Sequence, residues 1–115
     1  MKKKREILLY KNYFKEFYAP LSTRVRNKIK YVLKVLQAED NIPVRFFKHI
    51  ESVKGLYEIR IEYESNTYRI FCCLDEGQIV VLFNGFQKKS QKTPPKEIEL
   101  ATRIMKEYFK EKKGE

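Results

Sequence analysis

Residues 57–86, YEIRIEYESNTYRIFCCLDEGQIVVLFNGF, decide the fold because much of this stretch follows the two-residue period of β-strands. Tyr57, Ile59 and Ile61 alternate with charged residues, which is typical of a strand with one buried face. The interrupting sequences ESN and DEG favour turns. Residues 78–86 are almost continuously apolar and rich in β-branched side chains, as expected of a central strand. The stretch predicts a three-stranded antiparallel meander.

Helical patterns lie on both sides of this meander in the sequence. Residues 23–40 place apolar side chains at helical spacing, with arginines and lysines on the other face, and this amphipathic helix should end near Asp40. Asn12 is expected to cap a short helical turn through YFKEFY. Thr93 is expected to cap a last helix that has Pro94 at its first position, where a missing N–H costs nothing.

A short apolar run at residues 6–10 predicts one more strand, and residues 41–55 form a connection. The 115 residues are long enough for one core, so we expect a single domain over residues 1–115. The predicted fold class is α+β, with a small antiparallel-rich sheet, helices packed on one face and the order β-α-α-β-β-β-α.

The charge balance points to a polyanionic partner. Lys and Arg number 25 against 15 Asp and Glu, a formal net charge of +10, and such an excess repels itself in a compact state. A basic protein without a specific partner is the alternative. The adjacent Cys72 and Cys73 should be free, buried thiols, since neighbouring strand residues point to opposite faces. With no apolar stretch of membrane-spanning length, we expect a cytoplasmic location and no membrane partner.

The sequence lacks the residues that several kinds of catalytic and binding site require. His49 is the single histidine, so paired-histidine catalysis within one chain and most zinc sites are excluded. Phosphate-binding loops, serine nucleophile elbows and dinucleotide fingerprints are also missing. If the protein is an enzyme, we expect it to work without a metal or an organic cofactor.

Basic residues on the predicted strands are the remaining candidates. Arg60 and Arg69 each lie opposite the apolar set of their strand, and an even-numbered hairpin loop would make them cross-strand neighbours. Two adjacent guanidinium groups are best tolerated with an anion between them. The third strand brings Gln87, Lys88 and Lys89 to the same end of the sheet. Together these residues favour a phosphate-binding face.

Each of these residues also has a purely structural interpretation. Arg60 can pair with Glu58 or Glu62 on its own strand, and the lysines can simply be solvated. His49 is more often a packing residue than a catalyst. Lysines near a helix N-terminus, however, oppose the helix dipole, so Lys92 and its neighbours are poorly explained by stability.

The sequence resembles a known toxin family. The shared features are GLYEIR at 55–60, YRIF at 68–71, DEG at 75–77 and GFQKKSQKTP at 85–94 before a helix. This pattern is similar to the HigB-like, phage-derived branch of the RelE/ParE superfamily, and covers residues 55–108 closely. The resemblance implies the toxin of a type II toxin–antitoxin module. RelE-like members cleave mRNA in the ribosomal A site, whereas the ParE branch inhibits DNA gyrase.

Carried over by position, the resemblance implies catalytic roles for Arg60, Arg69 and Lys88 or Lys89, by metal-free attack of a 2′-hydroxyl on its adjacent phosphate. The catalytic tyrosine of some relatives has no counterpart here, and Glu58 stands where some relatives carry a lysine, so the general base is left open. The remaining candidate substrate contacts are Gln87, Lys92, Lys96, Lys54 and His49.

The expected partners are an antitoxin with a helix-turn-helix domain similar to HigA, the ribosome and mRNA. A non-catalytic gyrase inhibitor of the same fold and a non-toxic nucleic-acid-binding protein are the two alternatives.

Overall fold

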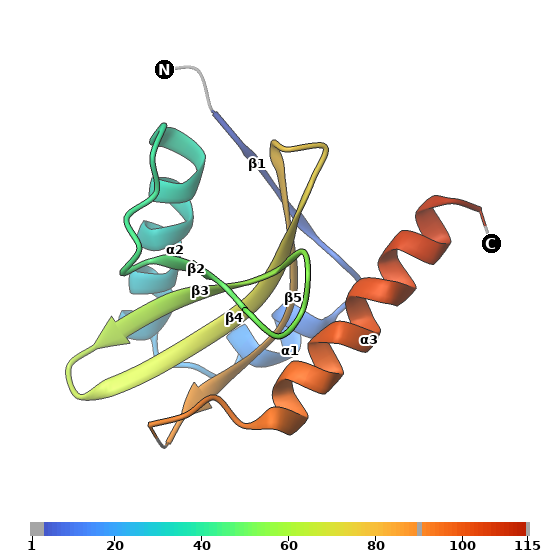
Figure 1. The fold of residues 1–115 in the computed structure, drawn as a ribbon. Helices are drawn as coiled ribbons and strands as arrows, with labels where there is room; N and C mark the ends of the chain where they lie inside the picture. The colour runs from blue at the N-terminus through green and yellow to red at the C-terminus, as the bar shows by residue number, and fades with distance from the viewer. Residues whose placement is uncertain (1–3, 90, 115) are drawn as a thin grey trace.

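The computed structural model describes residues 4–89 and 91–114, and its strands form one mixed five-stranded sheet in the order β1-β5-β4-β3-β2 (Figure 1). The three long strands of the meander pair antiparallel, whereas β1 pairs parallel with β5. The short strand β2 lies in the segment expected to be a connection, and it adds an edge to β3. The strands are β1 (Glu6–Leu9), β2 (Phe47–His49), β3 (Leu56–Tyr63), β4 (Asn66–Asp75) and β5 (Ile79–Lys88).

Three helices accompany the sheet: α1 (Tyr13–Tyr18), α2 (Thr23–Ala38) and α3 (Pro95–Lys112). At the start of α2 the Ser22 side chain accepts a hydrogen bond from the Val25 backbone N–H. The predicted cap at Asn12 is wrong in detail, because its side chain makes no capping hydrogen bond. The predicted cap at Thr93 is also wrong. Pro94 is the N-cap of α3, since a residue before a proline is held extended, and Pro95 is the first helical residue.

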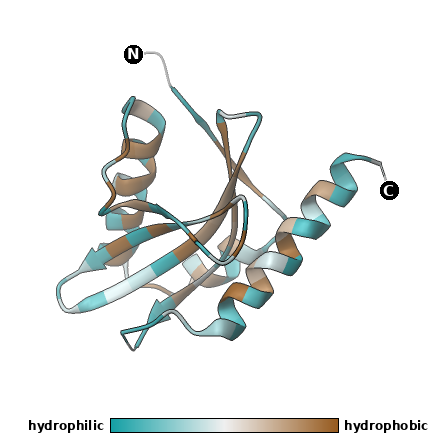
Figure 2. Cartoon of the chain, viewed as in Figure 1, coloured by the Kyte–Doolittle hydropathy of each residue, from teal (hydrophilic) through white to brown (hydrophobic). Residues whose placement is uncertain are grey.

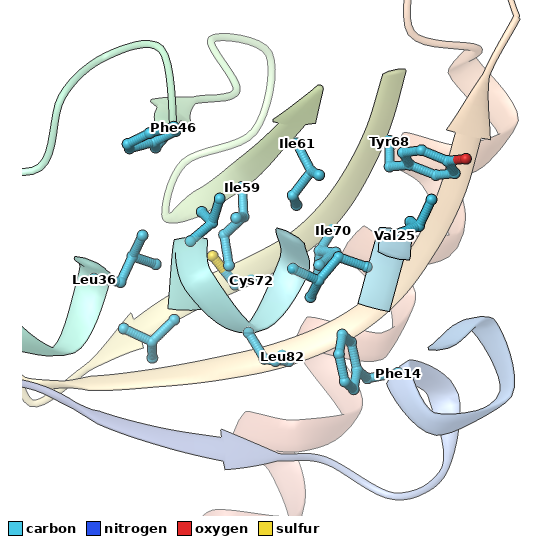
Figure 3. Close-up of a cluster of buried hydrophobic side chains, with 13 residues drawn as sticks. Phe14, Val25, Leu36, Phe46, Ile59, Ile61, Tyr68, Ile70, Cys72 and Leu82 are labelled. Carbon is cyan, nitrogen blue, oxygen red and sulfur yellow. The ribbon is translucent and has the colours of Figure 1, made fainter. Parts of the chain in front are cut away.

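The helices cover both faces of the sheet, which corrects the expectation that they pack on one face (Figure 1). On the first face, side chains of α1 and α2 meet strand residues such as Ile59, Ile70 and Leu82 (Figure 3). On the second face, α3 packs on Phe71, Val81 and neighbours. The physical reason is that β4 and β5 are apolar on both sides, so each side must be covered.

The cover by α3 is incomplete. The middle of the sheet is hydrophobic, whereas the β3–β4 hairpin and the end of β5 are more hydrophilic (Figure 2). The hairpin projects away from α3 in Figure 1. Part of the second face therefore stays open beside the helix. None of the helices in the described part of the chain combines the length and apolarity needed to cross a membrane.

Gly85 allows α1 to lie close to β5. A Cβ atom at this position would lie 2.6 Å from Cδ2 of Phe17, which is closer than carbon atoms can approach. The absence of a side chain is therefore what admits the Phe17 ring here.

Candidate functional site

Arg60 and Arg69 are direct cross-strand partners on β3 and β4, as predicted. The pairing follows from the hairpin: Tyr63 is opposite Asn66, so two residues form the loop. Both arginines lie on the face that α3 covers in part, not on a face free of helices. The predicted neighbourhood is confirmed. Because helices were expected on the apolar face alone, the arginines were expected on a face without helices, and that expectation is wrong.

Glu58 lies between the two guanidinium groups. Its Oε2 is 3.4 Å from Arg69 Nε, and its Oε1 is 3.9 Å from Arg60 Nε. Glu58 is only 7% exposed and Arg69 only 2%, whereas Arg60 is partly exposed. Arg69 is therefore not an ordinary exposed strand residue, because the sheet and its neighbours bury this side chain together with its counter-ion. Arg60 is therefore the arginine of the two that is accessible from solution.

The buried pair leaves one donor unused. Arg69 Nη1 donates to the backbone oxygen of Tyr68 at 3.1 Å. Within the described residues, neither Arg69 Nε nor Glu58 Oε2 has a hydrogen-bond partner, so their contact is an ion pair without good hydrogen-bond alignment. Buried polar atoms are usually paired. Because Arg69 Nε is buried against Glu58, an acceptor from solution could reach it only if Glu58 moved.

A β-bulge decides which lysine joins the arginines. Ile70 pairs with Gly85, but Cys72 pairs with Leu82, so the regular register is interrupted. On β5 the α3-covered face is taken by Phe83 before this irregularity and by Phe86 after it. The alternation thus changes from odd to even residue numbers. As a result Lys88, which pairs with Thr67, points to the side of Arg69.

These side chains line an open depression of about 550 Å³. Four of its lining residues are basic and one is acidic; the full set is Arg60, Glu62, Thr67, Arg69, Lys88, Lys89 and Gln91. We call this depression the basic cleft. A cleft lined by one sign of charge concentrates the opposite charge, so it suits an anion.

The surroundings of Lys88 lower the pKa of its ammonium group. Partial burial is the main cause of the lowered pKa of Lys88, and the positive charges of Arg69 and Arg60 add to it, while Glu58 opposes them. Burial likewise lowers the pKa of Arg69, against the effect of Glu58. Lys88 is the residue of the cleft best suited to give up and take back a proton, because a lowered pKa makes the neutral amine accessible.

The remaining predicted residues lie elsewhere. Gln87 pairs with Tyr68, so it faces the α1–α2 side, where its amide donates to Asn66. His49 is exposed on edge strand β2 and packs edge-on against Tyr57, on that same side. Lys54 is an exposed residue of the loop before β3. The expectation that Gln87 shares the face of the arginines is therefore wrong, and His49 and Lys54 lie outside the arginine cluster.

The lysines that follow β5 lie in two different places. Lys89 lines the basic cleft, whereas Lys92 and Lys96 are exposed residues outside its lining, as far as the structure describes them. Sequence reasoning missed Thr67 and Gln91 as lining residues, and it did not place Glu58 between the two arginines. Thr67 could have been found, since it lies two residues before Arg69 and thus on the same face of β4.

A larger groove of about 840 Å³ lies between the β2–β3 loop and α3. Val53 and Ile98 give it apolar walls, and Glu99 and Arg103 balance each other in charge. It brings together none of the predicted site residues. The basic cleft is therefore the candidate site, although it is the smaller of the two.

Comparison with known proteins identifies a family. The model of the family described as phage derived protein Gp49-like (DUF891) matches residues 16–106, which include every residue of the basic cleft. No curated protein matches the chain.

Proposed function

The chain belongs to the Gp49-like family of phage-derived proteins, a RelE/HigB-like toxin family, and we propose that it is a toxin that cleaves mRNA on the ribosome. The observation that carries the proposal is the placement of Arg60, Arg69 and Lys88 on one face of three adjacent strands. Glu58 offsets part of the charge of the two arginines, but four basic side chains line the cleft with one carboxylate, and this excess of positive charge is best explained by an anionic substrate. A scissile phosphate is such a substrate.

The chemistry that these groups support is transesterification within RNA. The 2′-oxygen forms a bond to phosphorus as the bond to the 5′-oxygen breaks, leaving a cyclic phosphate and a 5′-hydroxyl. Neutral Lys88 takes the proton of the 2′-hydroxyl, and Lys89 is the candidate to protonate the leaving 5′-oxygen. Arg60 binds a non-bridging oxygen directly, and Arg69 adds its charge from the floor of the cleft.

Dependence on the ribosome follows from how open the cleft is. Its walls hold charge but few groups that could fix the ribose and bases in a reactive geometry. Alignment of reacting groups contributes a large part of many rate enhancements. We infer that the ribosome supplies this alignment by holding the codon in place.

A toxin must be inhibited in the cell that makes it, and this one carries a net charge of +10. We propose an antitoxin with an acidic contact surface and a helix-turn-helix domain. Complementary charge should make association fast and sensitive to salt. Association rates that are equal at low and high salt would contradict this part of the proposal.

The deciding experiment maps mRNA 5′ ends after induction of the protein in bacteria, with and without a co-expressed antitoxin. We expect new 5′ ends within translated codons for the wild type and for Lys110→Ala, which removes the same charge from the exposed end of α3. Arg60→Ala and Lys88→Ala should not produce them. Growth arrest without new ends, but with altered plasmid supercoiling, would indicate a gyrase inhibitor instead. Normal growth would indicate a non-toxic binding protein.

A further inference from the structure

A second depression, of about 330 Å³, adjoins the basic cleft and shares Arg60 and Glu62 with it. It lies where the sheet edge opens: β2 pairs with β3 up to Ile59, and the Phe46 backbone oxygen then accepts a hydrogen bond from Arg60 N–H at 2.8 Å. Its lining residues come from α2, the segment before β2, and β3; they are Lys28, Tyr31, Arg45, Phe46, Arg60 and Glu62. The two depressions therefore form one continuous surface.

Aromatic rings and cations are interleaved in this second depression. The Lys28 ammonium lies 5.3 Å from the centroid of the Tyr31 ring, and the Arg45 guanidinium lies 4.8 Å from that of Phe46. The two rings meet edge to face, 6.4 Å apart. Aromatic rings beside basic side chains are typical of surfaces that bind single-stranded nucleic acid, since bases stack on the rings and phosphates meet the cations.

Tyr31 is poorly explained as a core residue. It is 53% exposed, whereas the apolar stripe of α2 that faces the sheet is fully buried. A large aromatic ring on the solvent side of a helix gains little from burial. The same ring is well placed to accept a flat partner from solution.

We propose that Tyr31 stacks on an unpaired base of the same RNA strand whose phosphate occupies the basic cleft, and that Lys28 and Arg45 bind the adjoining phosphate. This inference rests on the proposed function. Arg60 lines both depressions, so a strand that passes the scissile phosphate over Arg60 continues directly to Tyr31. Three cations against one carboxylate give the second depression the charge that a phosphate backbone requires.

The test uses ribosomes programmed with an mRNA in which 2′-O-methyl groups block cleavage. 2-Aminopurine is a base whose fluorescence is quenched by stacking. It replaces the base before the blocked linkage in one mRNA and the base after it in a second mRNA. We expect the wild type and Tyr31→Phe to quench the probe at one of these positions. Tyr31→Ala should not quench it at saturating protein. Val44→Ala, which removes an exposed apolar side chain from the segment before β2, is the matched control.

Single-turnover cleavage of the unblocked mRNA provides the second readout. Tyr31→Ala should raise the protein concentration for half-maximal rate about 5- to 150-fold, as loss of one stacked base predicts. The saturated rate should change less. Thermal unfolding checks that the variant is folded.

The outcomes separate this inference from the proposed function. If the wild type cleaves mRNA and Tyr31→Ala does so at the same concentrations, the stacking site is refuted and the proposed function stands. If Tyr31→Ala binds more weakly but the probe is quenched as in the wild type, Tyr31 contacts ribosomal RNA instead, which also overturns the proposal. If the wild type does not cleave at all, the proposed function itself fails.

Discussion

Replacing Arg69 by Met should both destabilise the fold and stop cleavage, because Arg69 is buried with its counter-ion. At an effective dielectric constant of about 20, Coulomb attraction is about 5 kcal/mol for the 3.4 Å contact of Glu58 with Arg69 and about 4 kcal/mol for the 3.9 Å contact with Arg60. Much of this attraction offsets the cost of removing the charges from water. The pair is therefore worth far less than its Coulomb sum.

Removing one partner of a buried ion pair typically costs about 3–5 kcal/mol, since the other charge stays buried. Arg60 stays beside Glu58 in the variant, so we expect the lower end, about 3 kcal/mol. For a chain of this size that corresponds to a melting temperature lowered by about 12 °C. Urea unfolding with an unchanged slope measures the loss.

A double variant separates stability from catalysis. In Glu58→Leu with Arg69→Met, apolar side chains replace both charges, and such replacements of buried pairs are often close to neutral. We expect its stability within about 1 kcal/mol of the wild type. Its single-turnover cleavage should still be about 100-fold slower or worse, since the charge at the floor of the cleft is gone. Wild-type unfolding of Arg69→Met would refute the buried-pair reasoning, and wild-type cleavage by the double variant would refute the site.

Three further predictions concern packing, proton transfer and acid stability. Gly85→Ala should destabilise the protein by about 1–3 kcal/mol in urea unfolding, because its Cβ meets the Phe17 ring; unchanged stability would show that the ring moves freely. Cleavage should quicken as pH rises through the lowered pKa of Lys88, and Lys88→Arg should be slow with no such rise. The hydrogen bond from the Lys112 ammonium is the main cause of the lowered pKa of Asp75. Asp75 therefore stabilises the fold at pH values above 3.8, the ordinary pKa of its carboxyl group. That contribution disappears as pH falls through the lower folded value, so acid unfolding of Asp75→Asn should lack this step.

The cross-strand pair could be predicted because it depends only on local rules. The two-residue period places Arg60 and Arg69 opposite the apolar sets of their strands, and the length of the hairpin loop fixes their register. The burial of Arg69 could not be predicted in the same way. It depends on Glu58 turning toward it and on how far α3 covers the sheet, and both are properties of the packed molecule.

The placement of His49 could not be predicted from the sequence, for a different reason. The residues around it were expected to be a connection, and only pairing with β3 turns Phe47–His49 into a strand with defined faces. A three-residue strand has too short a pattern to show a period of two. Its side-chain directions are therefore set by its partner strand and not by its own residues.

The lysines at the end of β5 show how one irregularity decides a site. Strict alternation from Phe83 would carry Gln87 and Lys89 to the side of Arg69 and turn Lys88 away. The bulge opposite Phe71 adds one residue to β5, so Lys88 points to the arginines instead. That position explains why the pKa of Lys88 is lowered by partial burial and by two guanidinium groups. The position of Lys88, the group best suited to proton transfer, thus depends on the bulge. The bulge could not be seen in the sequence, because β5 is almost continuously apolar and shows no alternation that a bulge would interrupt.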